Sequence, residues 1–85
     1  MKRFYYNVIF RPESEGGFTV VVPSLPGCIS YGRNLREAQN MARDAIKGYI
    51  VSLKKHGEPI PTDEGNFITL IDLEKISPKK SLSYA

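Results

Sequence analysis

Apolar side chains alternate with other residues along the first third of the chain, the pattern of strands that bury one face. Residues Phe4–Phe10 alternate in this way, and the β-branched run Phe18–Val22 follows a polar loop that ends in two glycines. Cys28–Tyr31 is long enough for a short third strand. Pro26 and Gly27 supply the turn before it, because proline presets φ and glycine accepts positive φ. The pattern predicts three consecutive strands.

A different period begins after Gly32, where apolar residues recur at steps of three and four, as on one face of a helix. The stripe predicts a single long helix over Leu35–His56. Asn34 is the expected N-cap, with Glu37 completing a capping box, and Gly57 is the expected glycine after the C-terminus. We expect a core in which strand and helix residues meet: Phe18, Val20, Val22, Ala38, Ala42, Ala45 and Tyr49.

Alternation returns in Asn66–Leu73, where both faces are largely apolar. The order β-β-β-α-β predicts an α+β fold, a single antiparallel sheet with one helix on one face. We expect residues 1–74 to form one domain and residues 75–85 a flexible tail. One helix can cover only one face of the last strand, so we expect a homodimer or higher oligomer. Its interface would contain Phe67, Ile68, Leu70 and Ile71.

Composition narrows the class of protein. The 85 residues are 41% hydrophobic and 25% charged, which is ordinary for one small globular domain. The longest uncharged apolar run is far shorter than the ~20 residues that a membrane span needs. No signal peptide is visible after Met1, and a single cysteine allows no internal disulfide. These features predict a cytoplasmic protein, and the formal charge of +3 permits a nucleic-acid partner without requiring one.

Candidate catalytic groups are few. Cys28 is the only thiol and would need a general base to act as a nucleophile. The only histidine, His56, lies at the far end of the predicted helix, so we interpret Cys28 as a buried strand residue. One histidine and one cysteine do not make a zinc site, and Gly16 and Gly17 fit no phosphate-binding motif. Of the carboxylates, only Asp72 falls within a predicted strand. The sequence therefore predicts a protein that is not an enzyme and has no cofactor or metal.

An ordered set of motifs spans most of the chain: GGF, then PxLPGCxxxG, then EAxxxAxxAIxxY, then GxxIP. In this order they resemble the HicB-like antitoxin family. The matching residues are Gly16, Gly17, Phe18, Pro23, Leu25, Pro26, Gly27, Cys28, Gly32, Glu37, Ala38, Ala42, Ala45, Ile46, Tyr49, Gly57, Ile60 and Pro61.

The resemblance implies a partial RNase H-like fold and an antitoxin that covers a small HicA-type toxin, an RNA-cleaving protein. Members commonly carry a C-terminal DNA-binding segment. This chain ends at Ala85 with no helix-turn-helix or ribbon-helix-helix pattern, so the sequence favours a stand-alone form and does not favour DNA binding.

A basic toxin surface would need carboxylates to pair with it. The densest acidic segment contains Glu58, Asp63 and Glu64, and the helix acids Glu37 and Asp44 are second candidates. The sequence predicts a loop for the acidic segment, so we expect charge reversal there to change stability little.

The alternative function is a nucleic-acid-binding accessory protein. It would use the aromatic residues Tyr5 and Tyr6 together with the basic face of the helix. The basic residues of that face are Arg36, Arg43, Lys47, Lys54 and Lys55.

Overall fold

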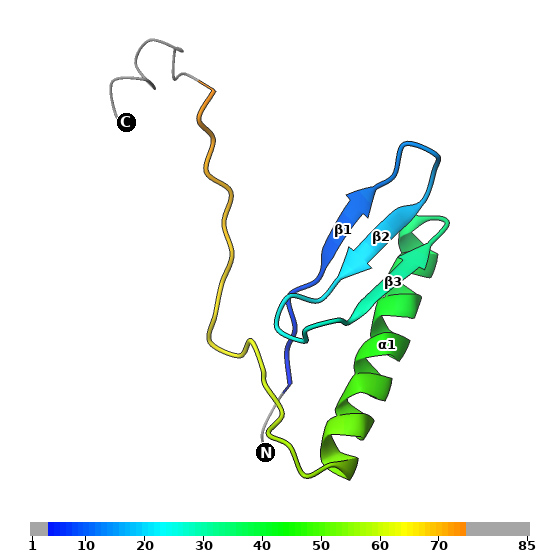
Figure 1. The fold of residues 1–85 in the computed structure, drawn as a ribbon. Helices are drawn as coiled ribbons and strands as arrows, with labels where there is room; N and C mark the ends of the chain where they lie inside the picture. The colour runs from blue at the N-terminus through cyan, green and yellow to red at the C-terminus, as the bar shows by residue number, and fades with distance from the viewer. Residues whose placement is uncertain (1–3, 75–85) are drawn as a thin grey trace.

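Three antiparallel strands and one long helix form the body of the protein in this computed structural model, which describes residues 4–74 (Figure 1). Strands β1 (Ile9–Pro12), β2 (Phe18–Val21) and β3 (Ile29–Gly32) form one sheet in the order β1-β2-β3. Helix α1 spans Leu35–Lys55 and packs mainly on β2 and β3. The predicted α+β class, with one antiparallel sheet and one helix, is confirmed.

The first strand begins later than the alternation predicted. Ile9 pairs with Val21, the last residue of β2, so residues 4–8 extend beyond the end of their neighbour. After Val21 the chain turns at once into the connection to β3: the Val22 N–H bonds to the Cys28 carbonyl at 3.1 Å. The residues before β1 therefore bond to the segment after the helix instead of to β2.

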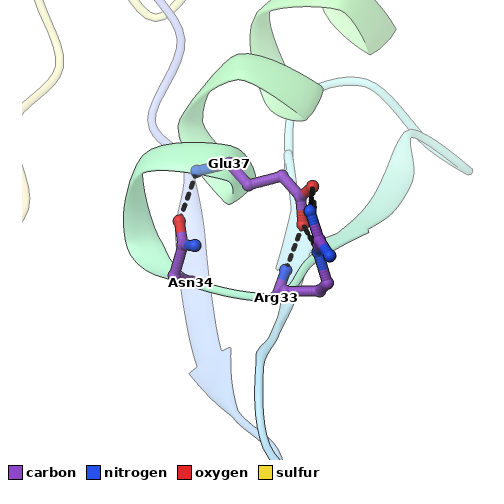
Figure 2. A network of polar contacts seen from close by, with 3 residues as sticks. All are labelled: Arg33, Asn34 and Glu37. Carbon is purple, nitrogen blue, oxygen red and sulfur yellow. Dashed lines mark hydrogen bonds and ion pairs between the residues drawn. The ribbon is translucent and has the colours of Figure 1, made fainter.

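Helix α1 begins where its cap residues indicate (Figure 2). The Asn34 side chain accepts a hydrogen bond from the Glu37 N–H at 2.8 Å, as predicted. The other half of the predicted capping box differs, since the Glu37 carboxylate accepts from the Arg33 N–H at 2.5 Å and pairs with the Arg33 guanidinium at 3.2 Å. At the other end His56 is the cap residue and Gly57 has φ +67°, the left-handed conformation that glycine adopts most easily.

The core consists of two adjoining clusters between α1 and the sheet. In the first, Val20, Ala38 and Ala42 are buried; in the second, Val22, Leu25 and Cys28 are buried. The partly buried residues around them include the other expected core members, Phe18, Ala45 and Tyr49. The predicted core is confirmed, and the fully buried Leu25 in the turn before β3 is an addition to it.

Small residues allow the helix to lie close to the sheet. A Cβ added to Gly32 would stand 2.3 Å from the Ala38 backbone nitrogen, a distance that no side chain tolerates. Glycine at the end of β3 and alanine in the first turns of α1 therefore set the separation between the two layers.

The predicted fourth strand is not formed in the described structure. Residues 66–73 are extended but pair with no strand among residues 4–74, and Figure 1 shows them running apart from the sheet. The divergence starts at a turn closed by the Asn66 N–H and the Asp63 carbonyl at 2.9 Å, in which Gly65 has φ +90°. The predicted tail at 75–85 lies outside the described residues.

The buried alanine stripe makes a direct test of the fold. Ala42 is 4% exposed, so Ala42→Glu would place a carboxylate between helix and sheet and lower the free energy of unfolding by about 3 kcal/mol. Urea titration followed by circular dichroism measures this change. Met41→Glu is the matched control, because its neighbouring side chain is 42% exposed and should tolerate a charge. Equal stability of the two variants would contradict the packing described above.

Candidate protein-binding surfaces

The carboxylate of Asp63 joins three separate segments of the chain. Its Oδ2 accepts the Asn7 N–H at 2.8 Å, and its Oδ1 accepts the Ser24 hydroxyl at 2.5 Å and the Asn66 side-chain amide at 3.4 Å. The Asp63 N–H donates to the Tyr5 carbonyl at 2.7 Å. The side chain is only 7% exposed. Asp63 thus fixes the segment after the helix against the residues before β1 and against the β2–β3 connection.

Hydrogen bonds to the charged form lower the pKa of Asp63. The Ser24 hydroxyl contributes most, the Asn7 N–H next, while burial acts in the opposite direction. A carboxyl group whose pKa falls on folding stabilises the folded state above its unfolded pKa of about 4, and this contribution is lost as the pH falls through the folded pKa.

Further bonds tie the same two segments together. The Tyr5 N–H donates to the Thr62 hydroxyl at 3.1 Å, and the Tyr6 hydroxyl donates to the Pro61 carbonyl at 2.5 Å. Burial, and secondarily the charge of Asp63, raise the pKa of the Tyr6 phenol, so this hydroxyl remains a donor at neutral pH. The expectation that charge in this acidic segment has little effect on stability is therefore wrong for Asp63, which is a buried structural residue.

The five acidic candidates do not gather into one patch. Glu58 and Glu64 are exposed near the C-terminal end of α1, whereas Glu37 is engaged by Arg33 at the N-terminal end. The helix of 21 residues between them is roughly 30 Å long. Asp44 is exposed near the middle of the helix. The structure thus leaves Glu58 and Glu64 as the exposed carboxylates of the predicted acidic segment.

An apolar row crosses the face of the sheet that α1 does not cover. Strand register places Ile9 beside Val21 and Val21 beside Ile29. Ile9 is 40% exposed and Ile29 is 61% exposed. Tyr31 lies on the same face two residues after Ile29, and its hydroxyl donates to the Gly16 carbonyl at 2.9 Å. In the sequence, this row corresponds to the apolar residues on the non-core side of each strand, which periodicity alone did not assign to a surface.

A groove of about 470 Å³ lies between the segment that leads into β1 and helix α1. Its walls are mainly aromatic and aliphatic, with Gln39 and Arg43 on the helix side. The remaining lining residues are Phe4, Tyr5, Tyr6, Val8, Phe10, Ala42 and Ile46. Phe10 is the β1 residue that lines the groove, and among residues 4–74 strand β1 has a neighbouring strand only on its β2 side.

The basic residues of the helix form a line on its outer surface. Arg36, Arg43, Lys47 and Lys54 are separated by 7, 4 and 7 residues, which at about 100° per residue brings them within roughly 20° of one direction. All are exposed, and none forms an ion pair with any residue between 4 and 74. We call this line the basic stripe. Lys55 lies to one side of it.

The candidate catalytic groups are placed as the sequence analysis interpreted them. Cys28 is 5% exposed in the second core cluster, and burial raises the pKa of its thiol, which keeps it protonated. Among residues 4–74 no three histidine, cysteine or acidic side chains are grouped so that they could hold a metal ion. The same residues contain no helix with the length and apolar character that crossing a bilayer requires.

The fold defines a small α+β domain with exposed apolar, acidic and basic surfaces. Comparison with known families makes the class specific: the family described as HicB-like antitoxin of bacterial toxin-antitoxin system matches residues 6–79. The chain belongs to this family of antitoxins.

Individual relatives are consistent with this assignment. A UPF0150 protein of Thermoplasma acidophilum is 45% identical over 65 residues, covering 76% of this chain and 94% of the relative. A UPF0150 protein of Synechocystis is 36% identical over 64 residues, covering 74% and 81% of the two chains. An uncharacterised 14.9 kDa protein of Haemophilus phage HP1 is 40% identical over 45 residues, covering 53% of this chain and 34% of the phage protein.

The Asp63 anchor gives a pH-dependent prediction. Asp63→Asn should lower the melting temperature at pH 7 and reduce the loss of stability between about pH 5 and pH 3, because the substituted group no longer takes up a proton. Thermal melts across this pH range measure both effects. Glu64→Gln, one residue away and exposed, is the matched control. Identical pH profiles for wild type and Asp63→Asn would show that the carboxylate does not hold the segment.

Proposed function

We propose that this chain acts in the cytoplasm as an antitoxin that binds a small HicA-type, RNA-cleaving toxin and covers its cleaving surface. The observation that carries the proposal is the family match, which extends over residues 6–79. Inhibition is steric and electrostatic, and this chain contributes no catalytic group to it.

The acidic contact with the toxin is assigned to Glu58 and Glu64. Both are exposed, and both lie in the segment that Asp63 holds against Tyr5 and Asn7. A carboxylate on an anchored segment loses less conformational freedom on binding than one on a free loop. Asp63, which the sequence analysis placed in the contact itself, acts here as a positioning residue beneath it. Glu37 and Asp44 remain the second candidates.

The acidic contact is tested by single charge reversals. Glu58→Lys and Glu64→Lys should each weaken binding to a purified HicA-type toxin and reduce its salt dependence, with unchanged thermal stability. Isothermal titration at two salt concentrations measures affinity, and an RNA-cleavage assay measures inhibition.

Glu15→Lys in the hairpin loop is the control, because it makes the same change in net charge at another exposed position. Equal affinities for all three variants would remove the acidic segment from the interface. A toxin whose RNA cleavage is unaffected by the wild-type chain would overturn the antitoxin proposal.

The basic stripe favours a second candidate function, binding of nucleic-acid phosphates. Its four cations extend from Arg36 to Lys54, an axial rise of about 27 Å along α1. Tyr5 is 49% exposed beside the groove, but the Tyr6 hydroxyl is bonded to Pro61, which restrains that ring. The interaction would thus depend on the stripe rather than on an aromatic platform.

Substitution within the stripe separates this function from the first. Arg43→Glu with Lys47→Glu should reduce RNA binding at least tenfold at low salt and flatten the dependence of affinity on salt. Fluorescence anisotropy with a labelled single-stranded RNA measures both. Lys55→Glu, which lies off the stripe, is the control. Undetectable RNA binding by the wild-type chain would rule the second function out.

A further inference from the structure

The segment after the Asp63 turn exposes far more apolar surface than a folded chain of this size normally leaves in water. Residues 66–74, which we call the arm, run separately from the sheet in Figure 1. Phe67 is 88% exposed and Leu70 is 96% exposed. Three further arm side chains are between 63% and 76% exposed: Ile68, Ile71 and Leu73. Water is an unfavourable environment for such a surface, so a partner surface is needed.

The described body of the protein presents a matching surface along β1. The sheet order β1-β2-β3 leaves the outer edge of β1 without a neighbouring strand among residues 4–74. The groove of about 470 Å³ lies beside this edge, between residues 4–10 and α1. An unpaired edge next to an apolar groove is suited to an added strand, because backbone groups pair with the edge and alternate side chains enter the groove.

The arm fits this surface in length and in pattern. Residues 66–74 extend roughly 30 Å when fully stretched, which is more than the length of Ile9–Pro12. The backbone groups of Tyr5 and Asn7 are already bonded to residues 62 and 63, so the edge that the arm can meet begins after them. A strand added to β1 points alternate side chains to the two faces of the sheet. One set, Phe67, Ile71 and Leu73, can enter the groove. The other set, Ile68 and Leu70, then continues the exposed apolar row that Ile9 begins.

The arm leaves the body of the protein at the Asp63 turn and runs apart from the sheet (Figure 1). Asp63 is bonded to Tyr5 and Asn7 before β1, and the turn after it is formed by the Asn66 N–H bond to the Asp63 carbonyl with a positive φ at Gly65. The arm and the outer edge of Ile9–Pro12 each lack a neighbouring strand among residues 4–74. A reciprocal exchange between two copies satisfies both arms and both edges under a single twofold axis.

We propose that a second copy of this chain receives the arm: residues 66–73 of each copy pair with the outer edge of β1 in the other and fill its groove. The exchange uses the groove and the β1 edge only. Glu58 and Glu64 lie outside it, so the arrangement stands independently of the toxin contact proposed above, whereas Arg43 of the basic stripe lines the groove.

Oligomeric state gives the first test. Light scattering on the full chain at micromolar concentration should give twice the 9.6 kDa of one copy. Ile68→Asp with Leu70→Asp should give a species of 9.6 kDa with unchanged circular dichroism in the helix region. Val51→Asp is the matched control, because it changes a 62% exposed aliphatic residue of α1 and should leave the dimer intact. A wild-type chain of 9.6 kDa would overturn the proposal.

A mixed-label experiment locates the contact. One chain carries a spin label at Thr69→Cys in a Cys28→Ser background and has no isotope label. It is unfolded together with ¹⁵N-labelled wild type, and the mixture is refolded. Amide signals of Val8 and Phe10 in the labelled copy should broaden, because the arm of the other copy lies beside them. Broadening at β3 or α1 instead, or no broadening between copies, would contradict arm exchange. In a second sample the spin-labelled Thr69→Cys chain itself carries ¹⁵N and is diluted with unlabelled wild type. Broadening of Val8 and Phe10 in that sample alone would place the arm on its own β1 edge.

Discussion

The buried carboxylate of Asp63 is the interaction on which the arrangement of the surfaces depends. It accepts hydrogen bonds simultaneously from the residues before β1, from Ser24 between β2 and β3, and from the turn that starts the arm. A buried carboxylate is costly unless it is well bonded, and three donors satisfy this one. Its position decides where the acidic segment is presented and in which direction the arm leaves. One side chain therefore connects the fold of the body to both proposed interfaces.

The body itself is organised by a close approach of small residues. Gly32 and Ala38 allow α1 to lie against the end of β3, and Val20 and Ala42 continue the contact along β2. Such close packing leaves little room for large side chains, and among residues 4–74 the core has six buried apolar residues. The larger aromatic and aliphatic side chains are displaced to the margins of the helix and to the arm. The apolar groove beside β1 is a direct consequence of this distribution.

Periodicity in the sequence was sufficient to predict the helix and strands that pack against elements near them in the chain. The stripe from Leu35 to Leu53, together with the Asn34 cap, predicted α1 to within one residue, and the three strands follow one another through short turns. The alternation in residues 66–73 predicted a last strand, and the structure shows an extended segment that pairs with no strand among residues 4–74. Periodicity alone could not indicate this, because pairing depends on where the preceding turn leads the chain.

The structural role of Asp63 could not be predicted from the sequence around it, because its partners are distant in the chain. Its bonding partners Ser24 and Asn7 are 39 and 56 positions away, and nothing in the local sequence distinguishes it from Glu58 or Glu64. The exposed row Ile9, Val21 and Ile29 was visible as apolar residues on the second face of each strand. Its meaning required the knowledge that a single helix covers only one face of this sheet.

The small core and the exposed arm have a common explanation. A chain of 85 residues buries a limited fraction of its surface, and stability in such a domain is commonly supplemented by association. Here the apolar residues that the core does not hold are collected on one extended segment and along one sheet edge rather than scattered over the surface. Scattered apolar residues would cause non-specific aggregation, whereas a strand and a matching edge have a fixed register and a fixed partner. The charged groups of α1 and of the acidic segment are thereby left for other molecules. In a family of antitoxins, this separation would allow the proposed self-association and the proposed toxin contact to use different surfaces of one small chain.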